Sequence, residues 1–383
     1  MTMEQLEING IDYFPKEVDF PKRPPWNFNM TPAELSNQEQ RYFTEYIASL
    51  EKSPHWKDMS YFELNLETWR QLWRVIEMSD ILLLIVDIRF VGMMFPPSLY
   101  DYIVNKLNKD MILIMNKIDL VPASVVVAWR EHVLSVYPKL NVVYFTSCLQ
   151  IRRRKGRQRM CVEGATKLLE ACKKVVNGQV DLTSWENKIR EESLVEFEDD
   201  DITIGKLLFF SILGCVGQPN VGKSSLMNAI MGKKVVSVSK TPGHTKHFQT
   251  IFLTKEVRLC DCPGLVFPST VPRTIQILMG SYPIAQLREP YSTIRYLAEA
   301  LDLVKLLKLE HPEKDDTWSP RDICDGWAKK RGFLTAKAAR LDTYRAANDI
   351  LRMALDGKIC VWLRPKGYLK ELGKNTMKKS TTY

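Results

Sequence analysis

The sequence has no long apolar run, no leader-like start and no paired cysteines. Residues 81–86 and 207–217 are apolar but fall short of the about 18 residues of a membrane-spanning helix, so both are expected to be buried strands. The start lacks a basic stretch followed by an apolar one, and no secretory signal is expected. Eight scattered cysteines without a Cys-x-x-Cys pair favour a reducing, intracellular compartment, and Cys260 and Cys262 are expected to pack rather than bind a metal.

Positive charge is in excess and unevenly distributed. The net charge is +9, and residues 265–383 contain 21 Lys and Arg against 13 Asp and Glu. A second basic run spans 151–159 and is followed by an acidic run at 191–201. Basic patches attract a phosphate backbone. For 151–159 alone, a solvated surface with a nuclear-import signal is an equal alternative.

The length and an apolar content of 45% allow two or three packed domains. Residues 1–60 are Pro-rich and then helical in pattern, which predicts an N-terminal arm. In residues 61–272, strand-like and helical runs alternate, which predicts an α/β domain with a mostly parallel sheet and helices on both faces. A charged insertion is expected at about 151–206, helical in its first half and loose in its second. Residues 273–383 predict an α-helical C-terminal domain. The predicted strands lie at 81–86, 111–115, 141–145 and 207–216, with a hairpin near 247–261.

The strongest local pattern lies between an apolar strand and a helix. It reads Gly217, Gln218, Pro219, Asn220, Val221, Gly222, Lys223, Ser224, with Ser225 next. This is the spacing of a phosphate-binding loop. Its glycines let backbone N–H groups face the β-phosphate, Lys223 reaches the β- and γ-phosphates, and Ser224 supplies a hydroxyl to Mg²⁺.

A second candidate phosphate-side element lies further along, at another predicted strand end. It consists of Asp261, Cys262, Pro263, Gly264 and Leu265. An isolated Asp-x-x-Gly is weak evidence and is more often a turn. After a phosphate loop, Asp261 is expected to hold Mg²⁺ through water and the amide of Gly264 to sense the γ-phosphate. Between the two elements, Thr245, or else Thr241, is the candidate threonine that closes over Mg²⁺, unless this segment is only a polar loop.

A candidate base-reading loop precedes both elements. It consists of Asn116, Lys117, Ile118 and Asp119. The carboxylate of Asp119 can accept both donors of the guanine Watson–Crick edge, and the wrong base would leave a buried charge without a partner. Lys117 would lie over the plane of the base. The next strand end, which is suited to supporting the base, contains Thr146, Ser147 and Cys148.

The order of these parts is base loop, support loop, phosphate loop, threonine loop and Asp-x-x-Gly. A cyclic rearrangement leaves each loop at its strand end, so the sequence predicts a circularly permuted P-loop G domain. This order, with segments such as "RPPW", "FPPSLYDYI" and "LRMALDGKICVWLRP", resembles the circularly permuted GTPases of the YlqF/YawG type. The resemblance covers about residues 22 to 368, interrupted in 151–206.

The resemblance implies that the chain binds GTP or GDP with Mg²⁺ and hydrolyses GTP slowly. It also implies a switch in ribosome assembly, with rRNA or a pre-ribosomal particle as partner and the nucleus, nucleolus and cytoplasm as locations. A monomer without membrane association is expected. The Asp-x-x-Gly loop leads directly into the C-terminal domain, so nucleotide state is expected to reach that domain. Its basic segment 328–340 is the candidate RNA contact, against the alternative of solvated helix faces.

The residues that carry catalysis depart from Ras-like enzymes in two ways. Leu265 follows Asp-x-x-Gly where Ras-like enzymes have a water-orienting glutamine, so water must be positioned by other groups. Asn220 occupies the position at which potassium-activated GTPases ligate K⁺, and a cation there would take the role of an arginine finger. Asp87 and Arg89 are expected to form a structural pair without a catalytic role. The catalytic candidates are therefore Lys223, Asn220, Thr245 and Gly264.

Three other functions remain open from the residues alone. The chain could be a GTPase switch with a protein partner in signalling or trafficking and no RNA. It could be a P-loop kinase or ATPase, for which residues 116–119 would be incidental. It could also hold GTP without hydrolysing it, since Leu265 cannot polarise water.

Overall fold

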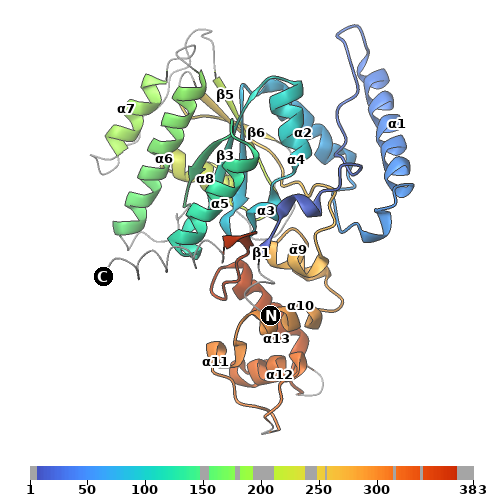
Figure 1. Cartoon of the computed structure of the whole chain (residues 1–383), viewed down its shortest axis with the longest axis vertical. Helices are drawn as coiled ribbons and strands as arrows, with labels where there is room; N and C mark the ends of the chain where they lie inside the picture. Colours follow the sequence, from blue (N-terminus) through green and yellow to red (C-terminus); the bar gives the residue numbers. More distant parts are fainter. Residues whose placement is uncertain are drawn as a thin grey trace. The chain divides into compact units, whose positions relative to one another are not determined.

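The computed structural model describes residues 7–146, 155–176, 182–192, 211–237, 248–254, 257–313, 316–336 and 340–368. These residues form two compact units (Figure 1). The first unit lies within Gly10–Thr270, and the second contains residues 7–9 and the described residues from Val271 to Tyr368. Residues 151–154 of the basic run and 193–201 of the acidic run fall outside what the structure describes.

A six-stranded, mostly parallel sheet forms the centre of the first unit. Its strands are β2 (Ile81–Asp87), β3 (Asp110–Asn116), β4 (Asn141–Tyr144), β5 (Ser211–Val216), β6 (Gln249–Phe252) and β7 (Val257–Asp261). The spatial order is β4-β3-β2-β5-β7-β6, and only the edge strand β6 is antiparallel to its neighbour. β2 is apolar from Ile81 to Val86 and is buried along its whole length, as expected for a parallel strand covered on both faces. The predicted sheet is confirmed.

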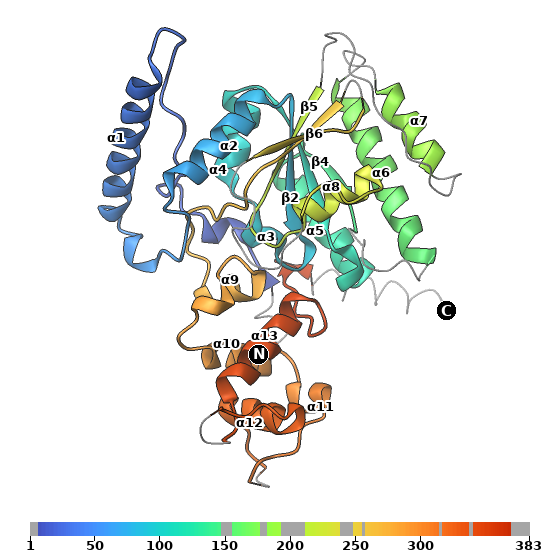
Figure 2. The same ribbon diagram turned by 180° about the vertical axis from the view of Figure 1, so that it is seen from behind.

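Helices cover both faces of this sheet. The helices of this unit are α1 (Pro32–Glu51), α2 (Leu66–Met78), α3 (Val91–Met94), α4 (Pro97–Tyr100), α5 (Ala123–Val136), α6 (Lys155–Val176), α7 (Thr183–Glu192) and α8 (Lys223–Met231), with the π-helix η5 (Asp101–Lys106); α1 and α7 lie outside the layers that cover the sheet (Figures 1 and 2). Four 3₁₀ turns complete the unit: η2 (Gly10–Tyr13), η3 (Trp56–Asp58), η4 (Ile88–Phe90) and η6 (Ile118–Leu120). Figures 1 and 2 show α2 and α4 on one face of the sheet and α6 and α8 on the other. No helix among the described residues is both long enough and apolar enough to cross a bilayer.

Residues 183–192 differ from the loose insertion that the sequence predicted. They form α7, which packs against α6. Leu182, Trp185 and Ile189 are buried at intervals of three and four residues, the spacing of one helix face. The high charge of the segment concealed this short apolar stripe, which has a partner only once α6 is in place.

The N-terminal part of the first unit is bonded to the segment that follows Asp-x-x-Gly. The amide of Glu63 donates to the carbonyl of Val266 at 3.0 Å, and the amide of Ser60 donates to the carbonyl of Ser269, also at 3.0 Å. These backbone hydrogen bonds hold the segment against a part of the chain that is distant in sequence.

Three aromatic side chains reinforce that attachment. The ring centroid of Phe267 lies 5.6 Å from that of Phe20 and 5.7 Å from that of Trp69, in edge-to-face geometry. Phe20 and Trp69 are also 6.3 Å apart. All three side chains are buried, so the segment after Asp-x-x-Gly is part of the hydrophobic core.

The second unit is largely helical. Its helices are α9 (Arg273–Met279), α10 (Tyr291–Ala300), α11 (Leu303–Leu307), α12 (Pro320–Arg331) and α13 (Thr343–Leu355), with the 3₁₀ turn η7 (Ile284–Gln286). Strand β1 (Glu7–Ile8) pairs in parallel with β8 (Arg364–Pro365). Residues 7–9 therefore lie with the C-terminal segment, although the sequence predicted residues 1–60 as a single arm. A two-residue strand carries no periodicity by which the sequence could reveal its pairing.

Candidate nucleotide-binding site

The phosphate loop joins β5 to α8 and has a backbone that only certain residues adopt readily. Asn220 and Gly222 both have left-handed backbone conformations, with φ of 59° and 98°. Asparagine and glycine are the residues that tolerate this region best. The loop therefore turns sharply before Lys223, the first residue of α8.

The side chain of Lys223 lies over this loop. Its ammonium donates to the carbonyls of Gly217 at 3.0 Å and Gln218 at 2.8 Å, and the side chain is buried. Burial lowers the pKa of Lys223, and the carboxylate of Asp261 opposes that shift. An ammonium group has three N–H donors, so two carbonyl contacts leave one for a phosphate oxygen.

Ser224 and Asp261 form the part of the site that fits a magnesium ion. The Ser224 hydroxyl donates to Asp261 Oδ2 at 3.1 Å, while Asp261 Oδ1 is buried and has no hydrogen-bond partner among the described residues. Burial raises the pKa of Asp261, against the opposing effects of Lys223 and Ser224. A hydroxyl and a buried carboxylate with an unsatisfied oxygen are ligands that Mg²⁺ accepts, directly or through water.

The Asp-x-x-Gly loop lies against the phosphate loop. The amide of Leu265 donates to the carbonyl of Gly217 at 3.2 Å. A Cβ atom on Gly264 would lie 2.9 Å from the Cα of Pro219, so no larger residue fits without displacing the backbone. Leu265 is fully buried. Pro263 belongs to the same loop, and Ser225 lies in the first turn of α8.

The base-reading loop begins at the end of β3. Asn116 is buried, and its Nδ2 donates to the carbonyl of Val221 in the phosphate loop at 2.8 Å. Its Oδ1 accepts from the amide of Lys117 at 2.8 Å. Lys117 has a left-handed backbone, with φ of 62°, which turns the chain toward Ile118 and Asp119. Asn116 thus joins two loops that the sequence separates widely.

Asp119 is exposed at the tip of this loop and is held by the strand end next to it. The hydroxyl of Thr146 donates to Asp119 Oδ1 at 2.6 Å. The amide of Ile118 also donates to the carbonyl of Phe145, at 3.4 Å. Thr146, which the sequence placed in a general supporting segment, therefore orients the carboxylate directly. Ser147, Cys148, Thr241 and Thr245 lie outside the described residues.

Asp87 and Arg89 lie beneath the base-reading loop. Asp87 is fully buried and accepts from the Lys117 ammonium at 2.7 Å. It also accepts from the Arg89 guanidinium, at 3.0 Å from Nε and 2.8 Å at the second nitrogen. Sequence reasoning expected a structural pair and missed the contact with Lys117. The available signal was that Asp87, like Asn116, ends an apolar strand.

Cys260 and Cys262 are buried at the end of β7. Burial raises the pKa of the Cys260 thiol to about 11 and moves the pKa of Cys262 upward as well. Both thiols are therefore neutral near pH 7. Within the described part of the chain, no group of three or more His, Cys, Asp and Glu side chains is arranged to hold a metal ion.

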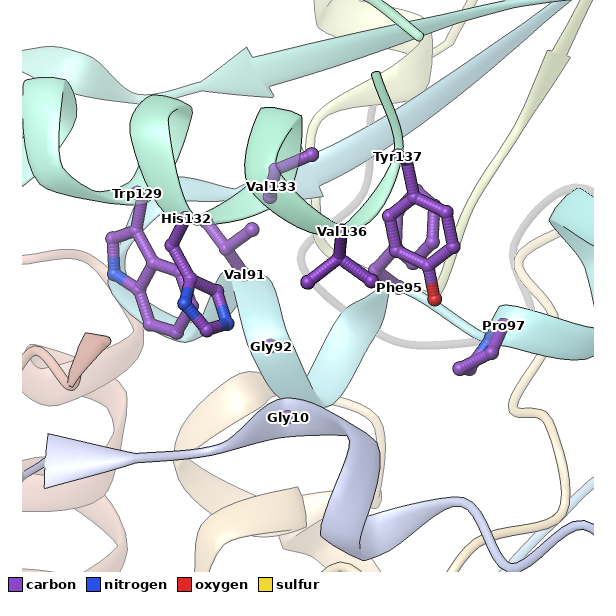
Figure 3. Close-up of a pocket in the computed structure, with 10 residues that line it drawn as sticks. All are labelled: Gly10, Val91, Gly92, Phe95, Pro97, Trp129, His132, Val133, Val136 and Tyr137. Atoms are coloured by element: carbon purple, nitrogen blue, oxygen red, sulfur yellow. The ribbon is translucent and has the colours of Figure 1, made fainter. Parts of the chain in front are cut away.

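A separate pocket in the first unit lies between α5 and the segments η2 and α3 (Figure 3). Its lining is mostly apolar and includes Trp129, His132 and Tyr137. Burial lowers the pKa of His132. None of the lining residues belongs to the nucleotide motifs, so this pocket is distinct from the site described above.

The chain matches known GTPases along most of its length. A family model described as a 50S ribosome-binding GTPase matches residues 212–313. Guanine nucleotide-binding protein-like 1 from Mus musculus is 45% identical over 96% of this chain and 68% of that protein, and the Homo sapiens protein is 44% identical over the same shares. Large subunit GTPase 1 from Saccharomyces cerevisiae is 31% identical over 93% of this chain and 59% of that protein.

Solved structures of YlqF from T. maritima also match the chain. The GDP-bound structure has 17% sequence identity and a TM-score of 0.45, covering 78% of this chain and 100% of that one. The GNP-bound structure has 18% identity and a TM-score of 0.46, covering 78% and 98%. With the sheet order and the relatives above, the chain belongs to the guanine nucleotide-binding protein-like 1 family of circularly permuted GTPases.

Proposed function

We propose that the chain binds GTP with Mg²⁺ at this site, hydrolyses it slowly to GDP and phosphate, and acts as a nucleotide switch in ribosome biogenesis. One observation carries the proposal of a single nucleotide site. The hydrogen bond from Asn116 to Val221 joins the base-reading loop to the phosphate loop. Asp119 can therefore contact the base, and Lys223 the phosphates, of the same nucleotide.

The arrangement around Asp119 suits guanine. Thr146 holds one carboxylate oxygen, and the side chain remains exposed. An ionised carboxylate offers about four acceptor positions, so the hydrogen bond from Thr146 leaves capacity for both donors of the guanine edge. Adenine presents an amino donor and a ring-nitrogen acceptor there and would leave the charge badly paired.

The chemistry follows from the groups around the phosphate loop. Water attacks the γ-phosphorus, the bond to the β–γ bridging oxygen breaks, and GDP departs with that oxygen. Lys223 counters the charge on the β- and γ-phosphates, and Mg²⁺ held by Ser224 and Asp261 would supply further charge neutralisation there. Leu265 offers no hydrogen bond to the attacking water, which accounts for a slow rate. Thr245 is the proposed threonine of the metal side, and Asn220 is the proposed ligand for an activating K⁺.

The proposal of a ribosomal partner rests on charge and on the names of the relatives. Residues 265–383 contain 21 Lys and Arg against 13 Asp and Glu, an excess that would bind a phosphate backbone. The matching family model is described as ribosome-binding, and the Saccharomyces cerevisiae relative is named for the large subunit. The nucleus, nucleolus and cytoplasm are the proposed places of action, and a monomer is the proposed form.

Sedimentation of the tagged chain with ribosomal precursors tests this function. We expect co-sedimentation with a GTP analogue that weakens with GDP and is lost in Lys223→Ala, which removes the phosphate contact. The double variant Lys329→Ala with Arg352→Ala removes two exposed charges of the second unit and should weaken association. The slope of the logarithm of affinity against the logarithm of salt concentration should become shallower by up to about two. The matched control, Lys57→Ala with Lys139→Ala in the first unit, should leave association unchanged.

Sedimentation, competition between nucleotides and phosphate release together separate the rival functions. Tight GTP binding without co-sedimentation at any salt concentration would overturn the ribosomal proposal and favour a switch with a protein partner. Equal competition by ATP and GTP would overturn guanine recognition itself. GTP binding without measurable phosphate release would leave a binding module instead of an enzyme.

A further inference from the structure

Asp87 lies beside the base-reading loop because of the register of the sheet. β2 and β3 are parallel, and Asp87 is the direct partner of Asn116 at their carboxyl ends. The residue after Asn116 is Lys117, which has a left-handed backbone, and the 3₁₀ turns η4 and η6 that follow the two strands contact each other. A carboxylate that ends β2 therefore lies within reach of the Lys117 ammonium.

Four donors surround the Asp87 carboxylate. Oδ1 accepts from the Arg89 amide at 3.1 Å and from its Nε at 3.0 Å. Oδ2 accepts from a second Arg89 guanidinium nitrogen at 2.8 Å and from the Lys117 ammonium at 2.7 Å. The carboxylate is fully buried. A buried carboxylate with two cationic partners has a well-defined position, because any displacement leaves charge uncompensated.

The ammonium of Lys117 is held from a second side as well. It donates to the carbonyl of Asn220 in the phosphate loop at 2.7 Å. Asp87 and Asn220 therefore hold the ammonium of Lys117 from two sides, at the phosphate loop. Without the carboxylate, a lysine side chain would have several rotamers available, and ordering it on nucleotide binding would cost conformational entropy.

We propose that Asp87 is a positioning residue for guanine nucleotide: it fixes the Lys117 side chain where that side chain can contact the base, and Arg89 holds Asp87. This inference rests on the proposed nucleotide function of the site. It assigns Asp87 no contact with the nucleotide. Its effect passes through Lys117, so it contributes to affinity for GDP and GTP alike and leaves the choice between purine bases to Asp119.

A double-mutant cycle on the full chain tests this assignment, with fluorescent GDP and GTP as probes. Asp87→Asn should lower the affinity for GDP and for GTP by a similar factor of about ten to a hundred, the loss expected for a charge-assisted hydrogen bond. The ratio of GTP to ITP affinity should not change. Lys117→Ala should lower the affinity for both nucleotides, and adding Asp87→Asn to this variant should lower the affinity little further.

A matched control is available near the opposite end of the same strand. Asp80, just before β2, is an exposed carboxylate whose Oδ2 accepts from the amide of Ile212 at 2.8 Å. Asp80→Asn makes the same chemical change far from the loops and should leave nucleotide affinity unaltered. If Asp87→Asn does not fold, Asp87→Glu keeps the charge, moves it by one methylene, and takes its place in the cycle.

The outcomes separate this inference from the function on which it rests. Failure of the wild-type chain to bind GDP or GTP would overturn the proposed function. Nucleotide binding that survives Asp87→Asn, or losses that simply add in the double mutant, would overturn the positioning role alone. A changed GTP to ITP ratio in Asp87→Asn would also contradict it, because base discrimination would then depend on Asp87.

Discussion

Asn116 and Val221 are 105 residues apart in the sequence, yet Asn116 Nδ2 donates to the carbonyl of Val221 at 2.8 Å. The two residues belong to the base-reading loop and the phosphate loop. In this permuted chain the base-reading loop comes first, and the parallel order β3-β2-β5 brings both loops to the same edge of the sheet. The permutation therefore changes the order of the parts and leaves their spatial arrangement intact.

Asp119→Asn should weaken GTP binding about a hundredfold or more, because the asparagine amide, unlike a carboxylate, cannot accept hydrogen bonds from both N–H donors of the guanine edge. It should improve binding of xanthosine triphosphate, whose edge offers an acceptor to the new amide N–H. Competition against fluorescent GDP measures both effects. Unchanged preference for GTP in the variant would show that another residue reads the base.

Asp261→Asn should abolish most of the Mg²⁺ dependence of GTP binding. The buried Asp261 carboxylate and the Ser224 hydroxyl are the paired groups that fit the ion. Affinity for GDP measured in EDTA should change little, since the proposed phosphate contacts of Lys223 and the loop amides do not need the metal. A magnesium titration of GTP affinity checks this, and a wild-type response in the variant would contradict the assignment.

Turnover should be faster in KCl than in NaCl, by about tenfold or more, if K⁺ supplies charge neutralisation next to the phosphates. Asn220→Ala should remove that stimulation, so that the ratio of its rates in KCl and NaCl falls to about one. Phosphate release at equal ionic strength is the measurement. Equal rates in the two salts would exclude a role for K⁺.

Phe267→Ala should lower the free energy of unfolding by about 3–5 kcal/mol, the usual cost of removing a fully buried aromatic ring. Phe267 is 2% exposed and packs against Phe20 and Trp69. Phe28, which is 94% exposed, provides the matched control, and Phe28→Ala should have almost no effect. Urea unfolding compares them, and similar midpoints would show that the segment after Asp-x-x-Gly is not anchored in the core.

Lowering the pH should reduce the free energy of unfolding, because the ionised Asp87 carboxylate stabilises the folded chain. Burial alone would raise the pKa of Asp87, but the positive charges of Lys117 and Arg89 outweigh it and hold that pKa well below its usual range. As the pH falls, the unfolded chain therefore takes up this proton first. The stabilisation is complete above about pH 5 and declines through the ordinary aspartate pKa near 4 toward the lower folded value.

The measurement is the urea midpoint of wild type and Asp87→Asn between about pH 7 and 3. The variant cannot titrate at this position, so the difference between the two midpoints should shrink as the pH falls. A difference that stays constant over this range would show that the carboxylate contributes no pH-dependent stability.

The sequence by itself determined the identity and order of the motifs and the position of the central strands. Residues 81–86 and 111–115 are apolar without alternation, a pattern typical of strands buried on both faces, and the structure has β2 and β3 there. The permuted order could be predicted because each motif is a short, contiguous stretch whose chemistry does not depend on distant residues.

Only the tertiary structure decided what lies beneath those motifs. The contact of Asp87 with Lys117 depends on strand register and on a left-handed backbone at Lys117, and neither has a local signature in the sequence. The same holds for Phe267, which joins the core through Phe20 and Trp69. Such contacts join residues remote in sequence. They form and contribute to stability only once the chain is folded, so no local sequence pattern predicts them.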